Sequence, residues 1–153
     1  MNKTVLITGA SSGIGEGCAR KFASQGARLI LNARSTDKLI ALAHDLQEKY
    51  DTQCYIMPFD VCNREAAIAA LNSLPEDWKG IDVLINNAGL AIGVDKEYEG
   101  NLEEWDTVID TNIKALLTMT RLVVPGMIER SKGHIINIGS IAGDAAYPGG
   151  SVY

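Results

Sequence analysis

A glycine-rich segment near the N-terminus has the residue types and spacing that suit phosphate binding. It reads Thr8-Gly9-Ala10-Ser11-Ser12-Gly13-Ile14-Gly15 and lies between an apolar run and a helical pattern. The first glycine allows a sharp turn, the second lets backbone approach a pyrophosphate, and the third lets the helix pack closely. Free N–H groups and the positive dipole at the helix N-terminus favour an anion there. Glycines also serve turn geometry alone, but the strand-to-helix position favours dinucleotide binding. The expected contacts are Gly9, Ser11, Ser12, Gly13, Ile14 and Gly15.

The end of the second predicted strand lacks an acid. NAD-selective folds usually place a carboxylate about 20 residues after the glycines, where it binds the ribose 2′-hydroxyl. Here the chain reads Asn32-Ala33-Arg34-Ser35, so Arg34 can pair with a 2′-phosphate and nothing repels it. We therefore expect NADP, with Arg34 and Ser35 among its contacts. The alternative is an ordinary solvated arginine, while the nearby Asp37 fits the first turn of the next helix.

Two further strand ends carry polar residues. Asn86-Asn87-Ala88-Gly89 follows the fourth apolar run, and asparagines ending a buried strand need hydrogen-bond partners. A structural role is therefore predicted for their amides from physics alone. Asp60-Val61 follows the third run, where an acid is also common without any function.

Three residues in the second half of the chain become candidate functional residues only when they are considered together with these motifs. Taken alone, Asn112 is typical of a helix amide, Ser140 of a loop serine, and Tyr153 is the last residue given. In register with the motifs above, the set resembles the short-chain dehydrogenases/reductases. The resemblance implies that Ser140 hydrogen-bonds the substrate oxygen, Tyr153 passes a proton and Asn112 holds a relay water. It also implies that Asp60 and Val61 contact the adenine, and that Asn87, Ala88 and Gly89 lie beside the cofactor ribose.

A narrower resemblance concerns one branch of that family. Residues 73–78, 88–93, 104–106 and 125–130 are similar to NADP-dependent serine and allo-threonine dehydrogenases, also described as 3-hydroxy acid dehydrogenases. The implied substrate is a small hydroxy acid or hydroxy amino acid, or the matching carbonyl compound. These segments carry no chemical argument of their own, and Trp78 and Trp105 are expected to be packing residues.

The elements that position these residues alternate along the chain. Short apolar runs at 4–8, 29–31, 54–59, 83–85 and 135–138 are separated by helical patterns. Such alternation predicts an α/β fold, a Rossmann-type doubly wound parallel sheet of about five strands. We expect one NADP-binding domain over residues 1–153. In the helix predicted over 101–130, Asn101 and Glu104 fit a capping box, and Pro125 should kink or divide the helix.

The composition argues against several classes of binding partner. The chain has 153 residues and a net charge of −5, without a basic patch for nucleic acid or an anionic membrane. Its three cysteines, Cys18, Cys54 and Cys62, have neither metal-ligand spacing nor a matching histidine cluster, so we expect no metal and no disulfide. No signal peptide and no apolar run of about eighteen residues is present, which favours the cytoplasm.

The resemblance covers roughly three fifths of a usual family member, so the domain is expected to be incomplete at its C-terminus. The family places a lysine four residues after the tyrosine, and nothing follows Tyr153 here. One alternative is thus a non-catalytic NADP(H)-binding fragment that lacks this lysine and the substrate loop; another is one part of a longer enzyme. An epimerase or dehydratase of the extended fold fits the glycine spacing less well. We also expect homo-oligomers, because the last strand and Leu116, Leu117, Met119, Leu122 and Val123 would expose apolar surface.

Overall fold

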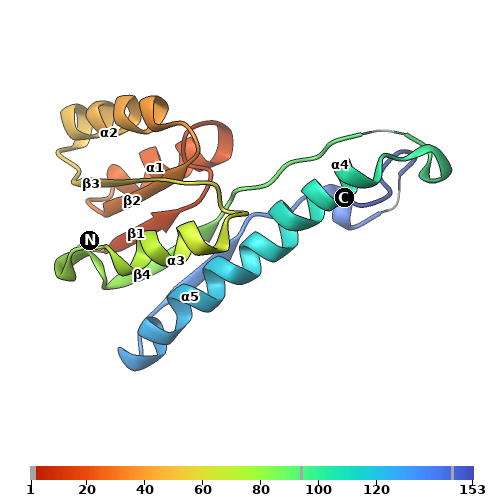
Figure 1. The fold of residues 1–153 in the computed structure, drawn as a ribbon. Helices are drawn as coiled ribbons and strands as arrows, with labels where there is room; N and C mark the ends of the chain where they lie inside the picture. Colours follow the sequence, from red (N-terminus) through yellow and green to blue (C-terminus); the bar gives the residue numbers. More distant parts are fainter. Residues whose placement is uncertain (1–2, 94, 146) are drawn as a thin grey trace.

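A five-stranded parallel sheet forms the centre of the protein (Figure 1). The structure, a computed structural model, describes residues 3–93, 95–145 and 147–153. The strands are β1 (Thr4–Ile7), β2 (Arg28–Ala33), β3 (Cys54–Pro58), β4 (Ile81–Asn86) and β5 (His134–Asn137). Their order in the sheet is β3-β2-β1-β4-β5, so the direction of winding reverses between β1 and β4. The predicted doubly wound arrangement is confirmed, and ligands bind at such reversal points.

Helices cover both faces of this sheet (Figure 1). The helices are α1 (Gly13–Ala23), α2 (Thr36–Tyr50), α3 (Arg64–Asn72), α4 (Leu102–Ile109) and α5 (Leu116–Glu129). The protein has one apolar core on each face of the sheet, and successive residues of β1 point into different cores. Val5 and Ile7 pack with α1 and α2, whereas Leu6 packs with α3 and α5. Burial on both faces explains why the strands are continuous apolar runs.

Helix α1 packs through small residues. Its buried positions are Gly15, Ala19 and Ala23, and Cys18 and Phe22 contact the same core. Ile14 has helical spacing with Cys18 and Phe22 but does not lie on this face, since Ile14 is 62% exposed. Ile14 precedes Gly15 by one residue and so points about 100° away from it around the helix.

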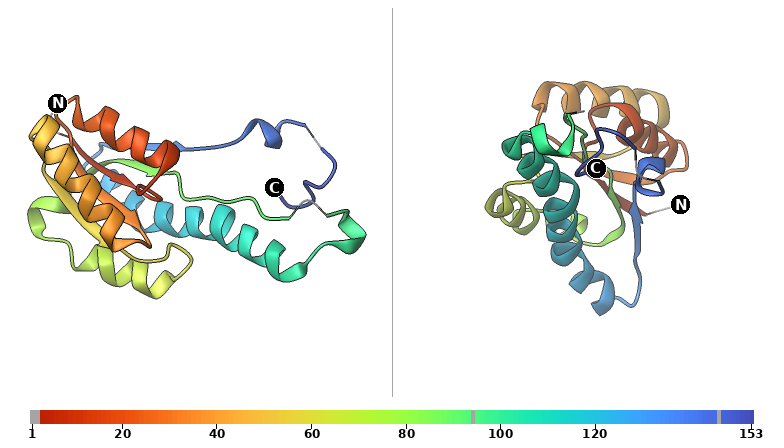
Figure 2. Two further views of the ribbon diagram at one scale, coloured as in Figure 1. Left: turned by 90° about the horizontal axis from the view of Figure 1, so that it is seen from above. Right: turned by 90° about the vertical axis from the view of Figure 1, so that its right-hand side faces the viewer.

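The long helical segment near the C-terminus is interrupted at a different place from the one predicted. Pro125 does not divide it, because α5 continues to Glu129. The irregular turn is instead a π-helix, η3 (Asp110–Ala115), which joins α4 to α5 and contains Asn112. Such wide turns are frequent at functional sites. Figure 2 shows this segment and the last residues of the chain extending beyond the sheet.

The capping box predicted at the start of α4 is only half formed. Asn101 Oδ1 accepts a hydrogen bond from Glu103 N at 2.9 Å, which confirms Asn101 as the N-cap. Glu104 returns no bond to the Asn101 backbone among the described residues. Its Oε2 lies 2.9 Å from where a Cβ on Gly93 would stand, so the side chain turns toward the 90s loop instead.

Strand β5 forms one edge of the sheet. It pairs with β4 on its inner side, and Ile135 and Ile136 are half-buried rather than buried on both faces. The expectation that the whole apolar row of α5 is exposed is wrong, because Met119 and Val123 belong to the core below β4. Leu117, by contrast, is 59% exposed.

Candidate functional site

Gly9 and Gly15 have no room for side chains at the carboxyl edge of the sheet. A Cβ on Gly15 would lie 2.3 Å from the Gly9 carbonyl oxygen and 2.5 Å from Asn87 Nδ2. Gly9 also has a φ of 64°, which few other residues adopt without strain. Asn87 Nδ2 donates to the carbonyl oxygens of Thr8 at 3.0 Å and Gly9 at 3.1 Å. The amide therefore fixes the loop backbone against α1.

The hydroxyl of Thr8 joins the end of β1 to the end of β4. Its Oγ1 accepts from the N–H groups of Asn87 and Ala88, both at 3.0 Å, and donates to the Ile85 carbonyl at 3.4 Å. These bonds use the full capacity of a buried hydroxyl. Thr8 follows directly after the buried strand β1, and this position is the sequence signal for its role.

The start of α1 presents an open surface next to this cross-link. Gly13 has a φ of 56°, and a Cβ there would meet nothing within 4 Å. Ser12 is the N-cap of α1, but its side chain makes no capping hydrogen bond. Ser11 is half-buried and Ile14 is exposed beside them. Backbone N–H groups at a helix start, with space in front of them, fit a pyrophosphate.

Arg34 and Ser35 follow β2 at the same edge. Arg34 is exposed and has no hydrogen-bond or ion-pair partner among the described residues. Ser35 is the N-cap of α2 and its hydroxyl makes no capping bond. An unpaired guanidinium beside a free hydroxyl and a helix N-terminus suits a second phosphate group. These residues therefore fit the 2′-phosphate of NADP.

Asp60 and Val61 form a tight turn after β3. Asp60 Oδ1 accepts from Cys62 N at 2.9 Å, and its backbone oxygen accepts from Asn63 N at 2.8 Å. Val61 is buried, whereas Asp60 is exposed. Cys62 Sγ lies 3.2 Å from Thr111 Oγ1, which links the turn to η3, and burial raises the pKa of the Cys62 thiol.

The amide nitrogen of buried Asn86 is hydrogen-bonded, whereas its Oδ1 has no partner among the described residues. Its Nδ2 donates to Thr120 Oγ1 in α5 and to Asn137 Oδ1 at the end of β5, both at 2.9 Å. The side chain thus ties β4 to its neighbours on two sides, as the sequence predicted.

Asn112 clamps the loop that follows β4. Its Nδ2 donates to the Leu90 carbonyl at 2.7 Å, and its Oδ1 accepts from Leu90 N at 2.9 Å. The same oxygen stands 3.2 Å from where a Cβ on Gly89 would be. An amide group has two donor hydrogens and two lone pairs, so one of each is left for another partner such as water.

Ser140 and Tyr153 lie on the segment that follows β5. Ser140 Oγ accepts from Ala142 N at 3.1 Å and caps a short turn, η4 (Ile141–Gly143). Tyr153 is 42% exposed and lines a pocket between α4 and the last residues, whereas Ser140 does not line it. No hydrogen bond joins Asn112, Ser140 and Tyr153 to one another in the part of the chain that the structure describes.

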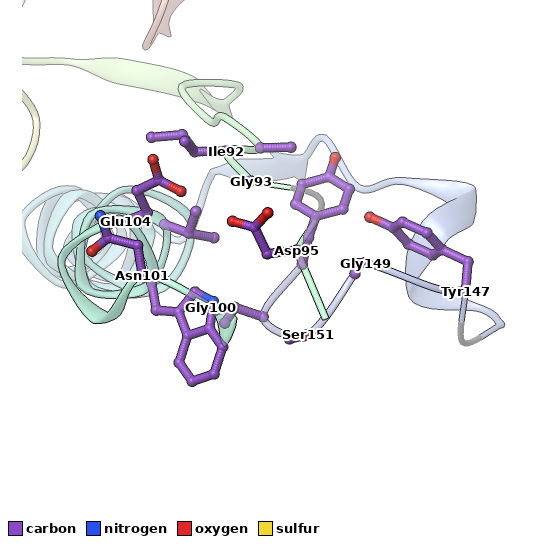
Figure 3. A pocket seen from close by; sticks show the side chains of 15 residues that line it. Ile92, Gly93, Asp95, Gly100, Asn101, Glu104, Tyr147, Gly149 and Ser151 are labelled. Atoms are coloured by element: carbon purple, nitrogen blue, oxygen red, sulfur yellow. The ribbon is translucent and has the colours of Figure 1, made fainter. Parts of the chain in front are cut away.

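The pocket that contains Tyr153 has an acidic wall (Figure 3). Asp95 and Glu104 are the charged residues among its described lining, and neither carboxylate has a hydrogen-bond or ion-pair partner there. Tyr147 faces them from the opposite side, carried on a turn in which Gly149 has a φ of 82°. Asp95 and Tyr147 could not be predicted from the sequence, because they come together from segments that are far apart in the chain.

These features define the class of protein. A doubly wound parallel sheet with a glycine loop at its reversal point is a dinucleotide-binding Rossmann fold. The short chain dehydrogenase family matches residues 3–153, and the chain belongs to that family. In the described residues no helix is long and apolar enough to cross a bilayer, and no group of three potential metal ligands occurs.

Individual relatives are similar over almost the whole chain. The NADP-dependent 3-hydroxy acid dehydrogenase YdfG of Escherichia coli O6:H1 is 48% identical over 97% of this chain and 58% of its own length. The crystal structure of serine dehydrogenase from Escherichia coli has a TM-score of 0.92 at 48% identity, covering 98% of this chain and 67% of that one. A closed form of serine dehydrogenase complexed with NADP⁺ has a TM-score of 0.90 at 47% identity, covering 98% and 59%. The chain thus spans less than two thirds of the curated relative's length.

Proposed function

We propose that residues 1–153 form one NADP-binding domain of an oxidoreductase, which transfers hydride between NADP(H) and a small alcohol or carbonyl compound. The observation that carries this proposal is the unpaired Arg34 beside Ser35, at the same sheet edge as the open Gly13 surface. The NADP-dependent relative and the NADP⁺ complex of a similar chain support it. The alternative of a binding module without turnover has no observation of its own.

The cofactor contacts follow the geometry of the edge. The pyrophosphate is assigned to the backbone and hydroxyl groups of Ser11 to Ile14, where the helix start supplies donors. The 2′-phosphate is assigned to Arg34 and Ser35, and the adenine to the Asp60–Val61 turn. The ribose on the nicotinamide side lies beside Asn87, Ala88 and Gly89. When bound, NADP supplies the hydride acceptor or, as NADPH, the donor.

The protein supplies acid–base groups for the reacting oxygen. Tyr153 would exchange a proton with the substrate oxygen, and the Ser140 hydroxyl would hold that oxygen by a hydrogen bond. Asn112 would hold a water through the hydrogen-bonding positions that Leu90 leaves free.

The charge of the pocket lining supports a hydroxy amino acid over a hydroxy acid as the substrate. Its described lining has two carboxylates, Asp95 and Glu104, and no cationic side chain. Such a wall repels a substrate with a net negative charge and attracts an ammonium group. Serine is neutral overall and carries that ammonium group, whereas 3-hydroxypropanoate is an anion. We infer that the substrate is a small 3-hydroxy amino acid.

Turnover assays test this proposal. NADP⁺ reduction is measured with L-serine, allo-threonine and 3-hydroxypropanoate, and we expect a preference for the amino acids. Tyr153→Phe should abolish turnover while leaving NADPH affinity unchanged, because it removes the proton and keeps the ring. Tyr98→Phe, at an exposed tyrosine outside the pocket, is the matched control. Cofactor binding without turnover of any substrate would contradict the enzyme proposal.

The remaining partners and the location are also proposals. Ile113, Leu117 and Ile128 expose apolar surface along η3 and α5, which supports a homo-oligomer. Cys18, Cys54 and Cys62 are all free thiols, which supports a reducing compartment such as the cytoplasm.

A further inference from the structure

Asn32 is a fully buried polar residue that contacts the ends of two neighbouring segments. It lies in β2 at 0% exposure. Its Nδ2 donates to the carbonyl oxygens of Met57 at 2.9 Å and Phe59 at 3.1 Å. Its own backbone oxygen accepts from Ala10 N in the glycine loop at 2.9 Å. One residue therefore contacts both the glycine loop and the chain that leaves β3.

Fold stability alone does not explain an asparagine at this position. Its Oδ1 is buried and has no hydrogen-bond partner among the described residues, which is unfavourable for a folded protein. Ile30, two residues earlier on the same face of β2, is packed in the apolar core below the sheet. A leucine at position 32 would have no unsatisfied acceptor, but it would also have no donor for Phe59.

The donor acts where the backbone ladder stops. The pairing of β2 with β3 ends with Ala33 opposite Pro58, and proline has no N–H to continue it. Phe59 follows directly, and its carbonyl is held by the Asn32 side chain instead. The next residue is Asp60, whose carboxylate and carbonyl oxygens organise the turn.

We propose that Asn32 is a positioning residue for the adenine end of the NADP site. By holding the Phe59 carbonyl, it fixes the Asp60–Val61 turn relative to the glycine loop and to Arg34, which follows β2 two residues after Asn32. The inference rests on the proposed function for its ligand. The geometric part, that Asn32 orders the turn, stands on hydrogen bonds within the chain.

Asn32→Leu tests the inference, with Ile30→Ala as the matched control. Both substitutions remove buried interactions from the same face of the same strand, but Ile30 donates nothing to the turn. Amide hydrogen exchange is measured at Cys62 and Asn63, whose N–H groups bond to Asp60. Affinity is measured for adenosine 2′,5′-bisphosphate and for nicotinamide mononucleotide, the two halves of the cofactor.

Asn32→Leu should speed exchange at Cys62 and Asn63 and weaken adenosine 2′,5′-bisphosphate binding, each by about tenfold or more, because the bonds to the Met57 and Phe59 carbonyls are lost. Nicotinamide mononucleotide affinity should not change, and Ile30→Ala should change neither quantity. Equal effects in both variants, or no effect in Asn32→Leu, would overturn the inference. If the unsubstituted protein binds no bisphosphate, the proposed function fails while the exchange comparison still decides the positioning role.

A measurement on the unsubstituted protein covers the case in which Asn32→Leu does not fold. The side-chain N–H₂ of Asn32 should exchange about a hundredfold or more slower than that of exposed Asn72, because it is buried and bonded twice. Exchange at the Asn72 rate would show that the bond to Phe59 is not held, and would overturn the inference.

Discussion

At the scale of single residues, amide side chains hold together the carboxyl edge of the sheet. Asn87 binds the glycine loop, Asn112 binds Leu90, and Asn32 binds the chain after β3. Each amide bonds to backbone carbonyl or N–H groups of a loop that has no strand partner there. The loops expected to contact the cofactor are therefore ordered by neutral hydrogen bonds, and Arg34 has no partner within the described part of the chain.

Arg34→Ala should raise the Kd for NADPH by about ten- to a hundredfold, because a charge-assisted contact to the 2′-phosphate is lost. The Kd for NADH should stay within about twofold, since NADH has no 2′-phosphate. Lys21→Ala removes the same charge at the far end of α1 and serves as the control. Fluorescence titration with both cofactors measures the effect, and equal weakening of NADPH and NADH would show that Arg34 has no selective role.

Local requirements of single residues were readable from the sequence, while contacts between distant segments were not. Gly9 and Gly15 were predicted because a tight turn and a close approach each demand glycine locally. Asp95 and Tyr147 were missed, because they share a pocket only after α4 and the last segment come together. The roles of Ser140 and Tyr153 came from the family resemblance and stay predictions.

At the scale of elements, the packing of α1 on β1 depends on one glycine. A Cβ on Gly15 would overlap the Gly9 carbonyl at 2.3 Å, whereas a Cβ on Gly17, two residues along the same helix, would meet nothing within 4 Å. The two positions share a helix but differ in what they face. Alanine substitution at the two positions therefore separates the effect of close packing from the effect of helix propensity.

Gly15→Ala should destabilise the protein by about 1–3 kcal/mol, because the overlap forces α1 away from the loop. Gly17→Ala should stabilise it by about 0.5–1 kcal/mol, since alanine is the better helix former and its methyl group has space. Urea unfolding measures both free energies. Equal effects of the two substitutions would contradict the close packing at Gly15.

The helical segment from α4 to α5 could be predicted only in part from the sequence. Its start at Asn101 and its extent to Glu129 follow from capping and apolar spacing, which are local. The π-helical turn η3 was not predicted, because it accompanies a tertiary contact, the clamp of Asn112 on Leu90. Pro125 lies inside α5, and the helix continues beyond it to Glu129.

At the scale of the whole molecule, Asp82 in β4 joins the two neighbours of that strand, β1 and the segment that leads into β5. Its Oδ2 accepts from Thr4 N in β1 at 3.0 Å, and its Oδ1 lies 2.7 Å from Lys132 Nζ before β5. Burial opposes ionisation of the carboxyl, but the bonds from Lys132 and Thr4 outweigh it and lower the pKa of Asp82. Because the pKa is lower in the folded protein, ionised Asp82 stabilises the fold at pH values above the unfolded-state pKa of about 3.9. This contribution is lost as the pH falls through the lower, folded-state pKa.

Asp82→Asn should therefore lower the unfolding free energy at pH 7 by about 1 kcal/mol or less, a size limited by the exposure of Lys132. The difference from the unsubstituted protein should shrink as the pH falls below about 3.9 and through the lowered pKa of Asp82. Asp106→Asn, at an exposed carboxylate of α4 without an ion-pair partner among the described residues, is the control. Urea unfolding across this pH range measures it, and a difference that does not change with pH would contradict the assignment.

Exposed apolar residues on α5 predict self-association. Leu117 and Ile128 are 59% and 71% exposed, and their spacing places them within about 20° of each other around the helix. Leu117→Glu should shift the protein toward monomer, whereas Ile68→Glu on α3 should not. Sedimentation at micromolar concentrations measures the distribution, and a compact monomer at all concentrations would exclude this interface.

The central claim is that the carboxyl edge of this sheet binds NADP through Arg34 and the glycine loop. Fluorescence titration of the unsubstituted chain with NADPH and with NADH tests it most directly. We predict saturable binding of NADPH that is about tenfold or more tighter than binding of NADH, because only NADPH carries the phosphate that Arg34 can pair with. Equal affinity for the two would contradict the assignment of Arg34, and binding of neither would contradict the glycine-loop site itself.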